Sequence, residues 1–466
     1  MKSLIPLLLL GTTLALQSRA LSQAPPAPLP VIEVLGQKFY TWEEYTSSSL
    51  FQSAGLRCNT PPFDPARGST KTGPSDCAYG STNPTSEYAP TFLYDIPVVV
   101  HVIERTNGVG HLTEAKVQSQ IDVLNEDFRA LSGSLGANGF DGMIRFHLAT
   151  EDPAGNPTNG ITYSVNNTWF NDGGSYWNFL AWDTHRYLNI YTNSASGYLG
   201  YVPDLPQGGI VGSNEDRVVV LYSSFGRNGS IGPPYNKGRT TTHEVGHYLG
   251  LWHPFDGGCG TIAGCYTTGD RICDTARESS PVFGCPGSSN SCSSPDPYHN
   301  YMDYSDDTCM WEFTPEQVRR MRCTIQHWRS NLATSTICNP TYSSGCAGTG
   351  GFVPALSVGG CATGGSSITL DLTNGLGGAS SFLFLGTTRT SIPMASGCLL
   401  NTYPFVGPAL GPFSNSGAGA GNGTLNLNIA VPVSISSGSL MMQAFQVDAG
   451  APNGWCNSNG VEIIIS

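Results

Sequence analysis

The sequence predicts an α+β fold in two parts: a mixed, twisted sheet with a helix packed on it, followed by a small all-β domain. Apolar, β-branched segments recur between residues 96 and 222, and one segment of helical period lies among them. Two more helical segments follow. Beyond residue 339 charged residues almost disappear, and short alternating segments stand between glycine-rich turns, which indicates a sandwich-like β domain.

Periodicity and capping define the elements of the first part. The run from Ile96 to Glu104 is typical of a buried strand, and Thr113 can cap a helix with one apolar face. Thr314-Pro315-Glu316-Gln317 is a capping box with proline at the first helical position. The expected strands are Ile96–Glu104, Ile144–Thr150, Leu188–Thr192 and Arg217–Tyr222, and the expected helices begin at Thr113, run from Thr240 to Leu249, and run from Thr314 to about Leu332.

The first residues have the pattern of a secretory signal. Lys2 precedes an apolar run from Leu4 to Leu16, and small residues follow at the place of a cleavage site. The run is shorter than the roughly 20 residues that a spanning helix needs, and no later stretch is long and apolar enough to span a bilayer. We therefore expect residues 1–24 to be a signal peptide and the protein to be secreted, in the extracellular space or a periplasm.

The rest of the chain divides by composition. Residues 25–90 are rich in proline, glycine and serine and predict a pro-segment. Residues 91–338 hold the strand and helix patterns of the main domain. Residues 339–354 are the predicted linker, and 355–466 the predicted C-terminal β domain. Only four charged residues lie beyond residue 339: Asp371, Arg389, Asp448 and Glu462.

Charge and cysteine content exclude some functions and favour others. The chain of 466 residues has 34 acidic and 22 basic residues, a formal charge of −12, and no run rich in lysine or arginine. Nucleic acid is therefore a poor candidate partner. Fourteen cysteines in an exported chain predict disulfide bonds. A structural zinc knuckle is a poorer interpretation, because the cysteines lack paired C-x-x-C units.

Residues 243–253 read His-Glu-Val-Gly-His-Tyr-Leu-Gly-Leu-Trp-His. On a helix, His243 and His247 point to one side, because four residues make about one turn. His253 can join them only if the helix ends, and Gly250 can supply that break in a left-handed conformation. Three neutral imidazoles leave one zinc position open for water, which is the arrangement of a catalytic site.

Glu244 is expected to be the general base of this site. It lies about 100° round the helix from His243, so it can accept the proton of a zinc-bound water that attacks a peptide carbonyl. The sequence therefore predicts a zinc endopeptidase that acts on proteins or peptides. The alternative from another class is an adhesive protein with a non-catalytic metal site, whose nearly uncharged C-terminal domain binds a surface or polymer. That domain could also direct export or anchoring.

The same motif resembles a known group of proteases. With the downstream stretch Asn300-Tyr301-Met302-Asp303-Tyr304-Ser305, it is similar to the metzincins, and in particular to the ulilysin-like members of the pappalysin family. The resemblance implies a metzincin catalytic domain. It also implies a Met-turn in which Met302 lies beneath the histidines, and a Tyr304 that hydrogen-bonds the tetrahedral intermediate. The strand Arg217–Leu221 would be the edge strand that holds the substrate.

The resemblance further implies a structural calcium ion and two disulfides. Asp270 and Thr275 match residues that help to bind Ca²⁺, a cation that prefers oxygen ligands on loops. Ala276 replaces a proline that the family often has, and a solvated acidic turn is the alternative. The implied disulfides are Cys265–Cys292 and Cys285–Cys309.

The predicted pro-segment contains a stretch that suggests latency. Arg57-Cys58-Asn59-Thr60-Pro61 is similar to the family's Arg-x-Cys-Gly-Thr, with Asn59 in place of glycine. The Cys58 thiolate would be a fourth zinc ligand in place of the water and would keep a zymogen inactive. A Cys58–Cys77 disulfide is the alternative.

The resemblance also implies a preference for arginine just after the scissile bond. Small pappalysins use an acidic residue at the base of that pocket, and Asp306 and Asp307 follow the Met-turn at about the right distance. A buried carboxylate and a guanidinium form a strong, geometry-sensitive pair. Either aspartate could equally be a solvated loop charge or a calcium ligand.

Overall fold

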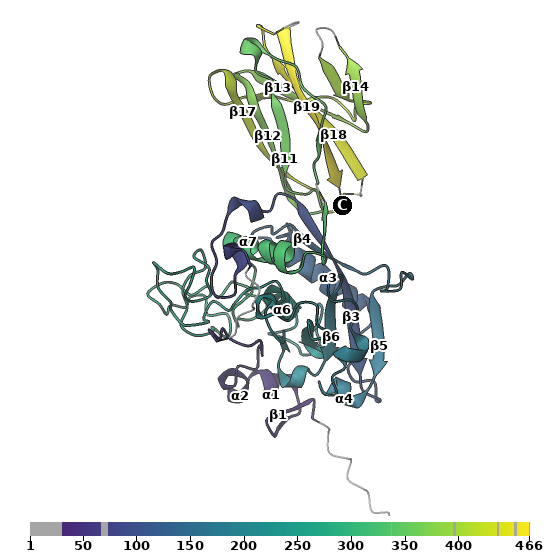
Figure 1. The fold of residues 1–466 in the computed structure, drawn as a ribbon, viewed down its shortest axis with the longest axis vertical. Helices are drawn as coiled ribbons and strands as arrows, with labels where there is room; N and C mark the ends of the chain where they lie inside the picture. Colours follow the sequence, from purple (N-terminus) through teal and green to yellow (C-terminus); the bar gives the residue numbers. More distant parts are fainter. Residues whose placement is uncertain are drawn as a thin grey trace, which may run out of the picture.

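The computed structural model describes residues 30–66, 73–336, 338–394, 398–435, 438–451 and 454–465. The predicted signal peptide lies outside these residues. Figure 1 shows the main α+β domain in the lower part of the molecule, with the C-terminal β domain above it and the first described elements at the opposite end. In the described part of the chain, no helix combines the length and apolar character needed to cross a bilayer.

A mixed sheet of seven strands forms the centre of the main domain. Its order is β4-β3-β6-β8-β7, and β5 and β9 also pair with β3. Strands β4, β5 and β6 run parallel to β3 and β8 runs parallel to β6, whereas β7 and β9 are antiparallel to their partners. The strands are β3 (Leu93–Glu104), β4 (Ile144–Leu148), β5 (Ile161–Val165), β6 (Leu188–Asn193), β7 (Gly200–Tyr201), β8 (Val218–Leu221) and β9 (Thr334–Thr336).

The open edge of the sheet differs from the prediction. Strand β8 lies between β6 and β7, so Arg217–Leu221 is not the edge strand, and that prediction is wrong. The edge is β7, which has only two residues. A strand that short has no alternating pattern, so periodicity could not reveal it.

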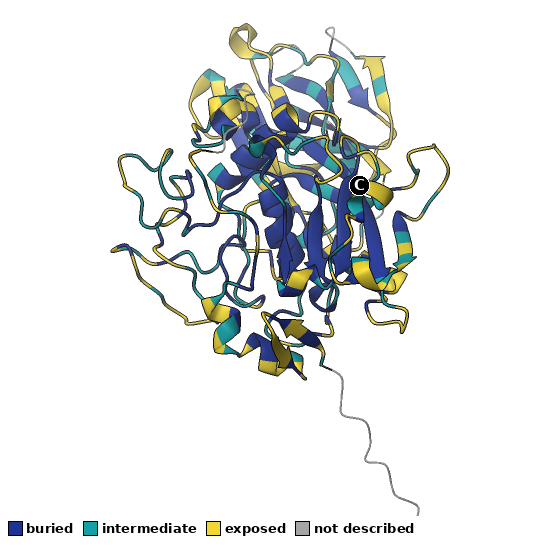
Figure 2. Ribbon diagram, turned by 60° about the horizontal axis from the view of Figure 1, so that its bottom comes forward, coloured by how far each residue is buried: buried dark blue, intermediate teal, exposed yellow. Residues whose placement is uncertain are grey.

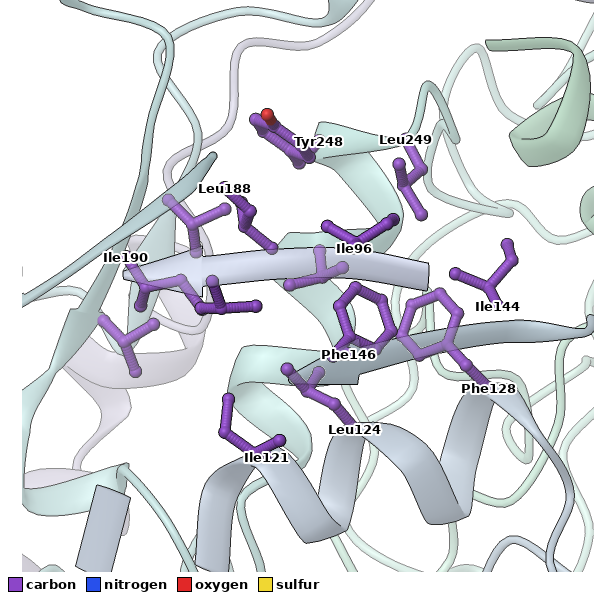
Figure 3. Packing of buried hydrophobic residues seen from close by; sticks show 14 of the residues in the cluster. Ile96, Ile121, Leu124, Phe128, Ile144, Phe146, Leu188, Ile190, Tyr248 and Leu249 are labelled. Carbon is purple, nitrogen blue, oxygen red and sulfur yellow. The ribbon is translucent and has the colours of Figure 1, made fainter. Parts of the chain in front are cut away.

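Helix α3 (Glu114–Phe128) packs against the sheet as its spacing predicts. Thr113 caps it by accepting the N–H of Lys116 at 3.2 Å. Figure 3 shows Leu124 and Phe128 of this helix packed beside Phe146 of β4. Residues from β3, β6 and helix α6 (Arg239–Tyr248) join the same buried cluster, so the helices and the sheet share one core.

Two further helices frame the site. Helix α6 (Arg239–Tyr248) matches the second predicted helix closely. Helix α7 (Pro315–Cys323) begins with the predicted capping box and continues as a π-helical turn at Thr324–Trp328. The helix therefore ends before the predicted Leu332, because the chain turns there to enter β9. The shorter helices are α1 (Trp42–Thr46), α2 (Ser49–Ser53), α4 (Asn167–Phe170) and α5 (Trp177–Leu180).

Residues 30–60 form a small folded cap on the main domain. The hairpin β1 (Ile32–Val34) and β2 (Gln37–Phe39) precedes α1 and α2. Six apolar side chains of the cap are buried in one cluster with residues of the main domain: Ile32, Val34, Phe39, Tyr45, Phe51 and Leu56. Figure 2 shows exposed residues concentrated in the loops and the cap, while α6 and the strands β6 and β8 are buried throughout.

Residues 75–90 are anchored to the main domain although the sequence places them in the pro-segment. Cys77 is disulfide-bonded to Cys323 of α7. The Arg320 guanidinium donates to the Ala78 carbonyl at 2.9 Å and to the Thr82 hydroxyl at 2.6 Å. The alternative Cys58–Cys77 disulfide is therefore wrong, and Cys58 is a free, buried cysteine.

The C-terminal part is a sandwich of two antiparallel sheets, as predicted. One sheet has the order β10-β19-β18-β13-β16 and the other β11-β12-β17, with β14 and β15 as a separate hairpin. The strands are β10 (Thr341–Tyr342), β11 (Ala355–Gly359), β12 (Ser367–Gly377), β13 (Ser380–Gly386), β14 (Arg389–Pro393), β15 (Leu399–Thr402), β16 (Leu410–Ser414), β17 (Gly419–Ala430), β18 (Gly438–Val447) and β19 (Trp455–Ile465).

The predicted linker 339–354 is part of this sandwich. Within it, β10 pairs with β19, and Cys346 is bonded to Cys398. The junction with the main domain is also fixed, because Arg129 donates to the Thr363 hydroxyl at 3.0 Å and to the Cys361 carbonyl at 3.3 Å. The glycine-rich composition therefore marks tight turns here and not a free connection.

Candidate metal centre and active site

Helix α6 carries His243 and His247 one turn apart, and all of its residues are buried. After the helix ends, Gly250 adopts a φ of +95°. A Cβ at this position would lie 2.7 Å from side-chain atoms of both Gln207 and Thr324. Glycine is therefore needed for its backbone freedom and for its small size.

The turn at Gly250 brings His253 back to the two helical histidines. The Nε2 atom of His247 lies 3.2 Å from Nε2 of His243 and 3.0 Å from Nε2 of His253. All three rings are buried, and burial lowers the pKa of His243 and His247 well below the usual value. The imidazoles of His243 and His247 are therefore neutral, the form that binds a metal ion.

Each imidazole is held by an acceptor at its other nitrogen. Such contacts fix the ring orientation and leave Nε2 free to bind a metal ion. The acceptors are the Tyr301 carbonyl at 2.7 Å from His243, the Leu251 carbonyl at 2.8 Å from His247, and the Asp256 carboxylate at 3.3 Å from His253.

The thiol of Cys58 completes the cluster. One ligand atom from Cys58 and one from each histidine lie within 4.8 Å of one another, and the sulfur is 3.6 Å from Nε2 of His247. Three imidazole nitrogens and one sulfur are a donor set that suits zinc in tetrahedral geometry. The residues present therefore fit a zinc ion.

Glu244 is directed into the same centre. Its carboxylate is fully buried, with Oε2 3.5 Å from the Cys58 sulfur and 3.3 Å from the Thr60 hydroxyl, whereas Oε1 has no hydrogen-bond partner. Burial raises the pKa of Glu244 to about 8. A Cβ at Gly200 in β7 would lie 2.7 Å from Cγ of Glu244, so the edge strand also limits where this side chain can lie.

Met302 packs against α6, whereas Tyr304 lies beside two of the three histidine rings. Met302 is fully buried, and its sulfur packs so closely on Gly246 of α6 that any Cβ there would clash. The Tyr304 ring lies 5.8 Å from the His243 ring and 5.2 Å from the His253 ring. Its hydroxyl donates to the Cys58 carbonyl at 3.4 Å.

The segment around Cys58 runs beside the edge strand of the sheet. The Leu56 carbonyl accepts the N–H of Leu199 at 2.9 Å, and the N–H of Asn59 donates to the Gly200 carbonyl at 3.1 Å. The Thr60 hydroxyl accepts the N–H of Val202 at 3.0 Å. This segment therefore lies along the edge of the sheet and takes up backbone groups of Leu199, Gly200 and Val202.

The long loop that follows His253 contains one of the two predicted disulfides but not the other. Cys285 is bonded to Cys309, as expected. The pair Cys265–Cys292 is wrong, because Cys292 is bonded to Cys259 and Cys265 to Cys273. Spacing cannot choose among neighbouring cysteines.

Asp270 and Thr275 lie buried in this loop near Glu278. Asp270 Oδ2, Thr275 Oγ1 and both carboxylate oxygens of Glu278 have no hydrogen-bond partner. Burial raises the pKa of Asp270 to about 8, and burial together with nearby carboxylates raises the pKa of Glu278 to about 10. Buried oxygen atoms of this kind are a donor set that suits calcium. Glu278 has no motif that sequence reasoning could have used.

Burial raises the pKa of Asp306 and of Asp307, and the positive charge of Arg57 opposes that rise in both. Asp307 is fully buried; its Oδ2 accepts the N–H of Lys237 at 2.7 Å, and its Oδ1 has no partner. Asp306 is half-buried. Sequence reasoning did not assign Arg57 or Tyr235 to this region, because Arg57 entered only as part of the latency stretch around Cys58 and Tyr235 belongs to no motif.

Comparisons with known proteins place the chain among metalloproteases. The family model described as Pregnancy-associated plasma protein-A matches residues 177–326. An extracellular metalloprotease of Verticillium alfalfae is 39% identical over 238 residues, which cover 49% of this chain and 75% of that protein. One of Colletotrichum graminicola is 35% identical over 246 residues, which cover 50% of this chain and 77% of that protein.

Among solved structures, a promirolysin mutant of Tannerella forsythia is 40% identical, covering 53% of this chain and 85% of that one, with a TM-score of 0.45. The matched family region contains α6 and Met302. Because identity above 30% extends over about three quarters of the curated relatives, this chain belongs to the pappalysin family and is a metalloendopeptidase.

Proposed function

We propose that this protein is a secreted zinc endopeptidase, made as a latent precursor, in which His243, His247 and His253 hold the metal. The convergence of three buried Nε2 atoms carries this proposal. When bound there, zinc supplies a Lewis acid and lowers the pKa of a coordinated water. Secretion accords with the names of its relatives, which are extracellular metalloproteases.

Glu244 acts as the general base in this proposal. Its Oε1 atom has no hydrogen-bond partner, so it is free to take a proton from water and to return it to the leaving amine. The Tyr304 ring lies 5.8 Å from the His243 ring and 5.2 Å from the His253 ring, where its hydroxyl can donate to an oxyanion. Met302 supports α6 from below and has no direct part in the chemistry.

Cys58 holds the precursor inactive in this proposal. Its sulfur lies within the ligand set and 3.5 Å from Glu244, so the latent chain has a thiolate where the active enzyme needs water. Removal of the segment that contains Cys58 opens that position and frees β7 for substrate. Cys58→Ser should therefore raise the proteolytic activity of the uncleaved precursor.

Two finer features complete the proposal. Asp270 and Thr275 bind a structural calcium ion together with Glu278, because all three have buried oxygen atoms without hydrogen-bond partners. Asp306 and Asp307 form the acidic base of a pocket that favours arginine after the scissile bond. A peptide library cleaved without preference for arginine would contradict this pocket assignment.

Casein hydrolysis tests the central proposal. The mature parent should cleave casein, and both a chelator and Glu244→Ala should abolish cleavage. Glu244→Ala should still bind zinc, because Glu244 is not a ligand. If Glu244→Ala cleaves as fast as the parent, the general-base assignment fails. If the zinc-loaded parent cleaves nothing, the adhesive interpretation gains support.

A further inference from the structure

The five-stranded sheet of the C-terminal domain carries a row of five aromatic side chains: Trp455, Phe445, Phe384, Phe405 and Tyr403. In this order, the centres of consecutive rings lie 4.9, 4.9, 5.1 and 5.6 Å apart. The first three residues belong to the neighbouring strands β19, β18 and β13 (Figure 1), and neighbouring strands lie about 4.8 Å apart. The row therefore crosses the sheet, with one ring from each of these strands.

The row lies on the face of the sheet that is turned away from the core of the sandwich. Side chains alternate between the two faces of a strand. Leu383 and Ala444, which precede Phe384 and Phe445, are buried in the core cluster of this domain. The five rings keep part of their surface exposed, up to 50% for Tyr403. The rings are therefore not part of the core and are available to a partner.

The two outer rings stand on a segment that is fixed to the sheet. The Val406 N–H donates to the Leu385 carbonyl at 2.9 Å, and the Thr387 N–H donates to the Pro404 carbonyl at 3.1 Å. Phe405, between these contacts, is bridged to the end of β13. A surface held in place in this way loses little conformational freedom when a partner binds.

The sheet is hollowed along the first part of the row. The hollow has a volume of about 490 Å³, and four aromatic rings line it: Phe382, Phe384, Phe445 and Trp455. Val447 is its only aliphatic side chain among the described residues. Ligand sites are commonly concave and lined by apolar and aromatic groups, and flat rings favour a ligand that is itself flat.

Electrostatics favours an uncharged partner at this surface. None of the described residues that line the hollow is charged. The four charged residues of the domain are engaged elsewhere, because Arg389 forms an ion pair with Glu462, and Asp371 and Asp448 accept hydrogen bonds within the domain. A charged ligand would therefore lose hydration on the row without gaining a counter-charge, which is unfavourable.

We propose that the aromatic row binds an uncharged polysaccharide. A sugar ring has a flat face of C–H groups that packs on an aromatic face, and a polysaccharide repeats such rings along an extended chain as the row does. Its hydroxyl groups lie at the rim of each ring, where the exposed Thr387 and Thr388 beside the outer end of the row can bind them. The domain would then hold the protease on a polysaccharide matrix, a role beyond the proposed proteolysis and independent of it.

Sedimentation with insoluble polysaccharides tests this inference. The full chain with Glu244→Gln, which prevents self-cleavage, is mixed with cellulose, a polymer of glucose, or with chitin, a polymer of N-acetylglucosamine. The protein left in solution is then measured. We expect binding to at least one polymer, and the two arms show which sugar fits. Because no ion pair is formed, the Kd should stay the same between about 0.1 and 1 M salt.

Variants of the row locate the binding surface. Phe445→Leu and Trp455→Leu keep apolar bulk but remove the flat face, and Tyr403→Leu/Phe405→Leu changes only exposed rings. Each should raise the Kd about threefold to tenfold, the range expected for the loss of an aromatic contact. The matched control is Phe352→Leu, an exposed aromatic residue beside β17 of the other sheet, which should bind like the parent.

Absence of binding to both polymers overturns the inference, and so does parental binding in all row variants. Binding to phosphatidylcholine vesicles alone would assign the row to a lipid surface. Dimers in ultracentrifugation that disappear in Tyr403→Leu/Phe405→Leu would assign it to a second copy of the chain, and either result also overturns the inference. If the variants at Phe445 and Trp455 fail to fold by circular dichroism, the exposed double variant decides. Inactivity on casein refutes the proposed function but leaves this binding result intact.

Discussion

Gly250→Ala tests how the chain after α6 controls the metal centre. Gly250 has a φ of +95°, where a residue with a Cβ is less stable by about 1–2 kcal/mol. The added Cβ would lie 2.7 Å from Gln207 and Thr324, and crowding of a packed site costs about 1–3 kcal/mol. We expect a total loss of about 2–5 kcal/mol, concentrated at the turn that positions His253.

The expected result is loss of zinc as well as loss of stability, because displacement of His253 removes one of three imidazoles. Zinc content after dialysis and thermal unfolding with and without a chelator measure the two effects. Gly155→Ala is the matched control, since Gly155 has a φ of +82° and no atom within 4 Å of an added Cβ. Gly155→Ala should lose only the about 1–2 kcal/mol of stability that comes from the left-handed backbone conformation, and it should keep the zinc content of the parent. Parental zinc affinity in Gly250→Ala would refute the reasoning.

Three further predictions concern other parts of the molecule. Gly246→Ala should destabilise the protein by about 1–3 kcal/mol, because the new methyl group meets the Met302 sulfur. In denaturant unfolding, the double variant Gly246→Ala/Met302→Ala should lose less stability than the sum of the losses of the two single variants. Burial lowers the pKa of His101 from 6.5 to about 4. Between pH 6.5 and pH 4 the imidazole therefore binds a proton in the unfolded chain but not in the folded one, and the free energy of unfolding should fall by about 3 kcal/mol as pH drops through this range. His101→Gln should reduce this dependence of stability on pH. Calcium should raise the unfolding temperature of the parent but not of Asp270→Asn, and an equal rise in both would exclude this site.

The sequence predicted those parts of the site that follow from local geometry. Helical spacing placed His243 and His247 on one side, and the conformational freedom of glycine at Gly250 explained the return of His253. The structure brings these residues together with Glu244 and Met302. The predictions for His243, His247, Glu244 and Gly250 depend on consecutive residues of one helix and the turn after it, so they needed no knowledge of tertiary contacts.

Long-range pairing was harder to predict, because it depends on distances that spacing does not contain. The partner of Cys77 is 246 residues away in sequence, and three cysteines between residues 259 and 273 compete for Cys292. The position of Arg57, whose guanidinium carbon lies 5.4 Å from the centre of the Tyr235 ring, likewise results from packing of the cap. The edge strand Arg217–Leu221 was implied by the resemblance and not by spacing, and the two-residue strand β7 that forms the edge carries no pattern of its own.

The bond between Cys77 and Cys323 determines which part of the chain can leave when the precursor is cut. A cut between Cys58 and Cys77 would free the cap together with Cys58. The chain that begins after the cut would stay covalently bonded to α7 through Cys77. The Trp328 indole also donates to the Cys77 carbonyl at 3.0 Å. The new amino terminus would therefore be held beside α7 as soon as it forms. Release of the cap would leave this crosslink between the amino terminus and the main domain intact.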